Sequence, residues 1–174
     1  EGMSGTILAI DLGGTHLRAA SAPLADPLKL TELGAWPAPR TRDELVALLT
    51  TQIARVGADR LGIGVPGLTG GTVCNWIPNL PFLDGLDLAA AFPGKSVALG
   101  NDAQLALLAE ASAGAAKGVS DAILLAIGTG IGSAVLAGGQ IIAGSQGGAC
   151  SFGWAAADPD DAGDDVSGWL ERHA

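Results

Sequence analysis

Basic residues are scarce in this sequence. Its 174 residues include nine lysines and arginines against eighteen aspartates and glutamates, which gives a formal net charge of −9. Only Lys29, Lys95 and Lys117 are lysines, and they do not form a cluster. Because nucleic acids and anionic membrane surfaces are bound through clustered positive charge, the composition argues against both as partners.

Cysteines and long apolar runs are also in short supply. Cys74 and Cys150 are far apart and have no metal-ligand spacing, which argues against a disulfide scaffold and against a zinc ribbon. No apolar run is long enough to cross a bilayer, and no charged segment leads into a secretory signal. We therefore expect a cytoplasmic protein with no membrane partner and with two reduced thiols.

Glycine and aliphatic residues are abundant instead. The sequence has 27 glycines and a hydrophobic content of 48%, but only four tryptophans, three phenylalanines and no tyrosine. These numbers indicate an aliphatic core with glycine-rich loops, which is typical of a compact α/β protein. The length suffices for one core, or for one domain and part of another.

Hydrophobic periodicity and turn residues predict the elements of residues 7–118. Three antiparallel strands come first, over residues 7–10, 16–21 and 28–36. The spacing of Thr41 and Glu44 is that of a capping box and predicts a helix that ends at Gly57. The remaining elements are a strand at 61–65, a loop or small ribbon at 68–79, a short helix at 87–92, a strand at 96–99 and a helix at 103–117 before Gly118.

The residues that follow begin the same pattern again. A strand at 121–127, a glycine turn at 128–133 and a strand at 134–137 repeat the opening unit, and a further strand at 140–143 comes after Gly138-Gly139. The repeat is not completed. The next segment is rich in aspartate and lacks the spacing of a Ca²⁺ loop, so we expect a solvated loop over residues 158–165.

The first glycine turn joins the first two strands. Asp11 ends the first strand, and Gly13-Gly14-Thr15 follow it. Adjacent glycines permit positive φ and expose N–H groups that can hold a phosphate, and the Thr15 hydroxyl adds a donor. A carboxylate fits beside that phosphate if Mg²⁺ lies between them, so Asp11 is the candidate metal ligand. The alternative is an ordinary Gly-Gly hairpin turn.

The second glycine turn has the related sequence Gly128-Thr-Gly-Ile-Gly132. One such turn in each half of a duplicated fold predicts that the two face one another and hold the same polyphosphate. The alternative is a dinucleotide-binding fingerprint, which requires a helix directly after the glycines. The residues after Gly132 are interrupted too soon for that helix, so the phosphate turn is favoured.

Asn101 and Asp102 follow a predicted buried strand and precede a predicted helix. Ligands of open α/β sheets collect at the carboxyl ends of strands. There, Asp102 could accept a proton from a substrate hydroxyl while Asn101 orients neighbouring hydroxyls. The alternative is that the two residues only cap the helix.

Together these motifs resemble the sugar kinases and repressors of the ROK family, in the actin-like ATPase and sugar-kinase superfamily. The resemblance covers nearly the whole chain and rests on the order and spacing of Asp11-Leu-Gly-Gly-Thr-His-Leu-Arg18, Gly64-Val-Pro-Gly67, Asn79-Leu-Pro81, Leu86-Asp-Leu88, Asn101-Asp102, Glu110, Gly128-Thr-Gly-Ile-Gly132 and Gly168-x-Leu-Glu171. It implies an α/β, ribonuclease H-like (actin-like ATPase) fold with a mixed sheet. Residues 3–117 would form the N-terminal lobe, and residues 118–174 would begin a similar second lobe that continues beyond this chain.

The resemblance also implies a reaction and a site. The reaction is ATP-dependent phosphorylation of a hexose hydroxyl, with ATP and Mg²⁺ as cofactors, in a protein that can be a homo-oligomer. Asp102 would be the catalytic base. The sugar would be contacted by Asn79, Asn101, Asp102 and Glu171, and the ATP phosphates and Mg²⁺ by Asp11, Gly13, Gly14, Thr15, Thr129, Gly130 and Gly132. The family's repressors have a helix-turn-helix segment before the first strand, which this chain lacks, so the kinase branch is favoured.

The sequence departs from the family at Cys150-Ser-Phe-Gly-Trp154, where Gly-Glu-x-Gly-His is usual. Ser151 replaces a carboxylate that binds sugar, and Trp154 replaces a histidine that contacts sugar and often ligates zinc. The family's cysteine-rich loop is missing too, so we predict no structural zinc. We expect Trp154 to be buried in the space left by the metal, and the alternative is that it stacks on a face of the sugar. These departures motivate an alternative function, a non-catalytic protein of the same fold that senses or binds sugar.

Overall fold

A computed structural model describes residues 5–127 and 131–154 of the chain. Their contacts divide the chain into two compact units, with the boundary between Asp102 and Ala103. The sequence analysis places a domain boundary later, after Lys117. The domain boundary of the intact protein stays a prediction. The two units are described one after the other.

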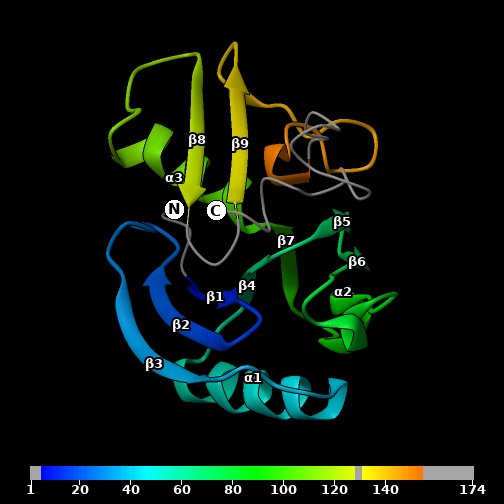
Figure 1. The fold of residues 1–174 in the computed structure, drawn as a ribbon. Helices are drawn as coiled ribbons and strands as arrows, with labels where there is room; N and C mark the ends of the chain where they lie inside the picture. Colours follow the sequence, from blue (N-terminus) through cyan, green and yellow to red (C-terminus); the bar gives the residue numbers. More distant parts are fainter. Residues whose placement is uncertain (1–4, 128–130, 155–174) are drawn as a thin grey trace, which may run out of the picture. The chain divides into compact units, whose positions relative to one another are not determined.

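The first unit contains a five-stranded mixed sheet with the strand order β3-β2-β1-β4-β7 (Figure 1). The strands β1 (Thr6–Leu12), β2 (His16–Pro23) and β3 (Thr31–Pro37) are antiparallel neighbours, which confirms the prediction for the first three strands. The strands β4 (Arg60–Val65) and β7 (Ser96–Asn101) extend the sheet in parallel with β1. The carboxyl ends of β1, β4 and β7 therefore lie at the same edge.

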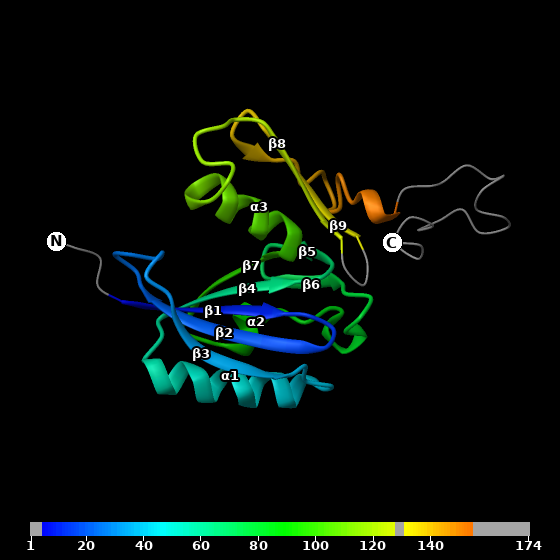
Figure 2. The same ribbon diagram turned by 60° about the vertical axis from the view of Figure 1, so that its left-hand side comes forward.

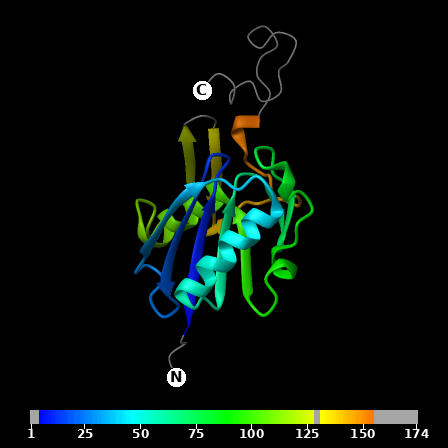
Figure 3. The same ribbon diagram turned by 90° about the horizontal axis from the view of Figure 1, so that it is seen from below.

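The helix α1 (Arg42–Val56) covers one face of this sheet (Figures 2 and 3). Its predicted caps are present: Thr41 Oγ1 accepts a hydrogen bond of 3.2 Å from the Glu44 N–H, and Gly57 ends the helix with a left-handed φ of 64°. The Glu44 carboxylate accepts a bond of 2.8 Å from the N–H of Arg40, one residue before the usual partner in a capping box. Local sequence thus fixes both ends of α1.

One aliphatic core joins α1 to the sheet. Alternate residues of β1 and β4 enter it, because successive side chains of a strand point to opposite faces. Each fully buried leucine or isoleucine contributes roughly 1.5–3 kcal/mol relative to an exposed one. The largest completely buried side chains of this core are Leu8, Leu12, Leu17, Leu45, Leu49, Leu61, Ile63, Val65, Ile77, Leu83 and Leu88.

The chain between β4 and β7 forms a small substructure. It consists of the two-stranded ribbon of β5 (Leu68–Gly70) and β6 (Val73–Trp76), the 3₁₀ helix η1 (Pro81–Leu83) and the short helix α2 (Leu88–Ala91). The ribbon and α2 confirm the elements expected at 68–79 and 87–92. Asp87 caps α2, since its Oδ1 accepts a bond of 3.0 Å from the Ala89 N–H.

The second unit packs the helix α3 (Asp102–Ala113) against the antiparallel hairpin of β8 (Ala122–Ile127) and β9 (Ile131–Ala137). A short strand, β10 (Gln140–Ile141), pairs with β9, and the 3₁₀ helix η2 (Phe152–Trp154) lies beside β9. This hairpin repeats the strand–turn–strand pattern of β1 and β2. A strand, not a helix, follows the second set of glycines, which excludes the dinucleotide-binding alternative.

Several predicted element boundaries are wrong. The strand expected at 134–137 begins at Ile131, and the strand expected at 140–143 ends at Ile141. The third strand was expected from residue 28, but β3 begins at Thr31 because the Lys29 N–H bonds to the Asp26 carbonyl in a turn. The long helix was expected to reach Lys117, but α3 ends at Ala113. There the Glu110 carboxylate accepts a bond of 2.6 Å from the Ala115 N–H, which satisfies a backbone donor outside the helix.

Both cysteines are free thiols, as expected. Burial raises the pKa of the Cys74 thiol to about 11, and the nearby charge of Asp84 adds to that increase. Cys74 is therefore protonated at neutral pH and behaves as a core residue. Within the described residues, no helix combines the length and apolar character that crossing a membrane requires.

Candidate functional site

The predicted residues of the first unit gather at the carboxyl edge of its parallel strands. In the register of the sheet, Asp11 of β1 is paired with Gly64 of β4, and Gly64 with Gly100 of β7. The segments that follow these three positions therefore leave the sheet side by side. They are the Gly13–Thr15 turn, the Pro66-Gly67 turn and the Asn101-Asp102 pair, so the sheet places the candidate phosphate turn and the candidate base at one edge.

The first glycine turn is short and exposed. It links Leu12 to His16, and the Gly13 N–H donates a bond of 2.9 Å to the His16 carbonyl. Neither Gly13 nor Gly14 has a positive φ, so the turn does not use the left-handed region that adjacent glycines permit. The physical reason for Gly14 is steric: a Cβ built on it would lie 3.0 Å from the Cβ of Asn79.

This close approach brings two predicted sites together. Gly14 belongs to the turn expected to hold phosphate, and Asn79 belongs to the loop expected to contact sugar. Asn79 is exposed, whereas Ile77 and Leu80 on either side of it are buried. The two loops therefore meet at Gly14 and Asn79, so a larger side chain at position 14 would displace Asn79.

Asp11 forms an ion pair with its cross-strand neighbour Arg18, with 3.8 Å between Oδ2 and Nη1. The pair is open to solvent, with side-chain exposures of 59% for Asp11 and 72% for Arg18, so it adds little stability. An exposed carboxylate next to a phosphate-binding turn suits Mg²⁺, which takes one or two carboxylates and fills its other positions with phosphate oxygens and water. Among the described residues, no three acidic, histidine or cysteine side chains are grouped so that they could hold a metal ion.

Asn101 is the last residue of β7, and Asp102 is the first residue of α3. Asn101 Nδ2 donates a bond of 3.2 Å to the Gly67 carbonyl in the turn after β4. Asp102 is exposed. The predicted placement of this pair at the junction of a strand and a helix is confirmed, and the role of Asp102 as a base stays a prediction.

Of the residues predicted in the second half, the structure describes Gly132. It lies within β9, paired with Ala126, and not in the turn where the sequence placed it. Its ideal Cβ would be 3.6 Å from the Cβ atoms of Ala103 and Ala126, which is ordinary van der Waals contact. Thr129, Gly130 and Glu171 lie outside the described residues, as does the aspartate-rich loop at 158–165.

The segment that departs from the family is held by a residue that sequence reasoning missed. The buried Ser133 of β9 donates a bond of 2.7 Å from Oγ to the Cys150 carbonyl and accepts one of 2.7 Å from the Phe152 N–H. Ser151 lies between these two anchors. The signal was a polar residue at an inward position of an otherwise apolar strand. Trp154 is 50% exposed, so the expectation of a buried tryptophan is wrong.

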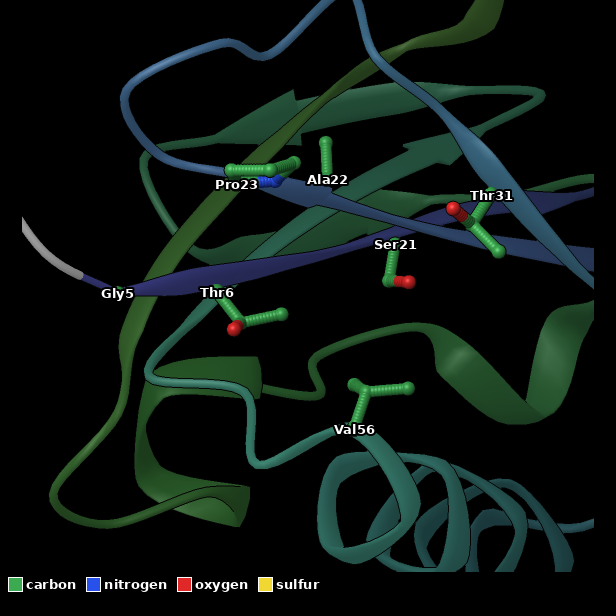
Figure 4. Close-up of a pocket in the computed structure, with 7 residues that line it drawn as sticks. All are labelled: Gly5, Thr6, Ser21, Ala22, Pro23, Thr31 and Val56. Atoms are coloured by element: carbon green, nitrogen blue, oxygen red, sulfur yellow. The ribbon is translucent and has the colours of Figure 1, made fainter.

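A pocket of about 310 Å³ lies elsewhere in the first unit (Figure 4). Its lining residues are Gly5, Thr6, Ser21, Ala22, Pro23, Thr31 and Val56. They belong to the start of β1, the end of β2, the start of β3 and the end of α1, at the opposite edge of the sheet from Asp11. No charged side chain lines it, so this pocket is not part of the candidate site.

Comparison with known sequences identifies proteins that are similar to this chain over most of its length. A sequence model described as the ROK family matches residues 7–164. An N-acetylmannosamine kinase of Citrobacter koseri is 34% identical over 171 residues, which cover 87% of this chain and 54% of that protein. A glucokinase of Halalkalibacterium halodurans is 28% identical over 166 residues, which cover 84% of this chain and 48% of that protein.

Comparison with solved structures identifies the fold. The crystal structure of a ROK family glucokinase from Streptomyces griseus in complex with glucose and AMPPNP matches with a TM-score of 0.76 and 25% identity. The match covers 90% of this chain and 52% of that one. The chain thus has the α/β fold of actin-like ATPases, and it spans about half the length of the curated relatives it matches.

Proposed function

Because the chain belongs to the ROK family, we propose that the intact protein transfers the γ-phosphoryl group of ATP to a hydroxyl group of a hexose. The observation that carries this proposal is the convergence at one sheet edge of the Gly13–Thr15 turn and Asp102. The contact between Gly14 and Asn79 adds the expected sugar loop to the same place. A phosphate turn, a carboxylate and a sugar loop are the parts that phosphoryl transfer to an alcohol requires.

Asp102 would act as the general base. It would accept the proton of the sugar hydroxyl as that oxygen attacks the γ-phosphorus, in line with the bond to the departing ADP. Asn79, Asn101 and Glu171 would bind other hydroxyls of the sugar and orient the attacking one. The bond from Asn101 to the Gly67 carbonyl supports this role, because it limits the rotation of the side chain.

The two glycine hairpins would hold the donor. Backbone N–H groups and the hydroxyl of Thr15 in the first turn would bind phosphate oxygens, and Thr129, Gly130 and Gly132 would do so from the second hairpin. Asp11 would hold Mg²⁺, which supplies positive charge to the phosphate oxygens when it is bound. We propose that the two hairpins face one another in the intact protein, whose second domain the β8–β9 hairpin begins.

A second function is favoured by one observation. Ser151 and Trp154 stand where the family usually has a carboxylate and a histidine, so the intact protein could bind sugar without transferring phosphate. Serine keeps a hydroxyl for hydrogen bonding but loses the negative charge of the carboxylate. The alternative is therefore a sugar-sensing protein with the same fold.

One experiment separates these functions. The intact protein is supplied with ATP, Mg²⁺ and a panel of hexoses that includes glucose and N-acetylmannosamine, and release of ADP is followed by a coupled assay. Sugar-dependent ADP release supports the kinase. A sugar-dependent rise in the melting temperature without ADP release supports the sensor, and the absence of both effects overturns the proposal.

A further inference from the structure

Arg42 occupies an unusual position for a cation. It is the first residue of α1, where the helix dipole disfavours positive charge, and the acidic Asp43 and Glu44 follow it as expected. Among the described residues, its guanidinium group forms no ion pair with either of these carboxylates. Instead Arg42 Nε donates a bond of 2.7 Å to the Phe82 carbonyl, and Nη2 donates one of 2.7 Å to the Asp84 carbonyl.

These two carbonyls belong to the loop that presents Asn79. Inside the loop, the Asp84 carboxylate accepts a bond of 2.7 Å from the Ile77 N–H, which closes the segment from residue 77 to residue 84. The backbone of Leu80 donates to the Ile77 carbonyl and accepts from the Leu83 N–H. The loop is thus a closed unit with Asn79 exposed at its tip.

Apolar packing and backbone bonds also connect the loop to the rest of the first unit. The buried side chains of Ile77, Leu80 and Leu83 anchor its inner side in the core. Close packing of these side chains limits the movement of the inner side of the loop, and the hydrogen bonds add directional contacts at its backbone. The two bonds from Arg42 reach the loop from a separate helix. The other directional contacts are backbone bonds at the end of the loop, where the Leu86 N–H donates to the Leu83 carbonyl at 2.8 Å and the Gly85 N–H donates to the Cys74 carbonyl at 2.7 Å.

We propose that Arg42 is a positioning residue for the sugar: it fixes the orientation of the 77–84 loop and thereby the place of Asn79 beside Gly14. This inference rests on the proposed function. The guanidinium group suits the task because its planar set of N–H donors can span two carbonyl oxygens, whereas the ammonium group of lysine is a single point donor. A displacement of Asn79 by about an ångström can cost roughly ten- to hundredfold in turnover at low sugar concentration.

The test compares Arg42→Met, Arg42→Lys and Arg55→Met in the intact protein. Arg55 is a matched control, because it lies on the same helix and also donates to a backbone carbonyl, that of Leu33 at 3.1 Å, but not to this loop. We expect Arg42→Met to raise the KM for the hexose about tenfold or more, with a smaller effect in Arg42→Lys. The KM for the hexose should stay unchanged in Arg55→Met.

A second measurement does not depend on turnover. Hydrogen exchange of the amides from Ile77 to Leu86 should become faster in Arg42→Met without sugar and stay unchanged in Arg55→Met. If the KM for the hexose or the exchange rate is the same in Arg42→Met as in the wild type, the inference is wrong. If Arg42→Met does not fold, Arg42→Lys decides by the same two measurements. Wild-type protein without sugar-dependent turnover would overturn the proposed function instead, while the exchange experiment would still decide whether Arg42 orders the loop.

Discussion

The side-chain amide of Asn101 donates a hydrogen bond to the backbone carbonyl of Gly67, with 3.2 Å between Nδ2 and O. The bond connects the end of β7 to the turn that follows β4, so it links two neighbouring segments of the candidate site. Gly67 itself cannot carry a side chain. A Cβ at this position would overlap with the Trp76 carbonyl oxygen and lie 2.8 Å from Ile77 Cδ1.

The first prediction concerns Gly67→Ala. The added methyl group meets backbone as well as side-chain atoms, so the turn and the ribbon must move apart, and we expect a loss of about 1–3 kcal/mol in the free energy of unfolding. Activity should fall as well, because the carbonyl that orients Asn101 is displaced. Urea denaturation measures the first effect. Gly62→Ala in β4 is the control, since a Cβ there meets nothing within 4 Å, and equal stability of Gly67→Ala and Gly62→Ala would contradict the prediction.

The second prediction concerns Asp102. Asp102→Asn keeps the size and shape of the side chain but removes its ability to accept a proton, so we expect kcat to fall about 10²- to 10⁴-fold. The affinity for the hexose and the fold should be retained, and Asp102→Ala should also abolish turnover with the fold intact. Steady-state kinetics, titration calorimetry and circular dichroism measure these properties.

The control for this change is Asp43→Asn. Asp43 also lies in the first turn of a helix, so its replacement removes the same favourable interaction with a helix dipole, worth about 0.3–1 kcal/mol. Turnover should be unaffected. Wild-type turnover in Asp102→Asn would exclude Asp102 as the base and leave it as a helix-capping residue.

The third prediction concerns the contact between the two loops. Gly14→Ala places a methyl group 3.0 Å from the Asn79 Cβ, which forces Asn79 to move. We expect the KM for the hexose to rise, by roughly tenfold for each 1.4 kcal/mol of sugar-binding energy that is lost. Gly13→Ala is the comparison: its Cβ would lie 3.5 Å from the His16 carbonyl, an ordinary contact, and not against Asn79. If both variants change the KM for the hexose equally, the contact does not couple the loops.

Local sequence predicted much of the fold. The helix α1 follows from Thr41, Glu44 and Gly57, because the two caps and the helical periodicity lie within one continuous segment. The three antiparallel strands and the later hairpin follow from short apolar runs separated by glycines. The boundaries failed where an interaction of a single side chain or turn decides the end of an element, as at Lys29 and Glu110.

The candidate site was predicted less completely, because its contacts join distant residues. The sequence indicated that adjacent glycines permit positive φ, whereas the structure gives Gly14 a different reason, its close approach to Asn79 far away in the sequence. Arg42 was missed because its two acceptors lie 40 and 42 residues later. A signal was nevertheless present, since arginine is unfavourable at the start of a helix and its occurrence there indicates a partner outside the helix.

The last prediction concerns pH. The Thr72 hydroxyl donates a bond of 2.8 Å to the Asp87 carboxylate, and with the N–H groups of Ala89 and Ala90 it lowers the pKa of Asp87. The ionised carboxylate therefore stabilises the fold above the ordinary pKa of aspartate, and this contribution is lost as the pH falls through the lowered value. Thr72→Val removes the largest cause, so the pKa of Asp87 should rise and the variant should be less stable than the wild type at neutral pH.

The difference between wild type and Thr72→Val should shrink in acid, because the protonated carboxyl group of Asp87 no longer gains from the charged hydrogen bond. Carbon NMR of the carboxyl groups measures the pKa, and chemical denaturation at several pH values measures the stability. Asp121 is the internal reference. The Ser120 hydroxyl and the Gly138 N–H lower its pKa independently of Thr72, so its titration should not change. A stability difference that persists unchanged below the pKa of Asp87 would mean that Thr72 acts through packing and not through the charge of the carboxylate.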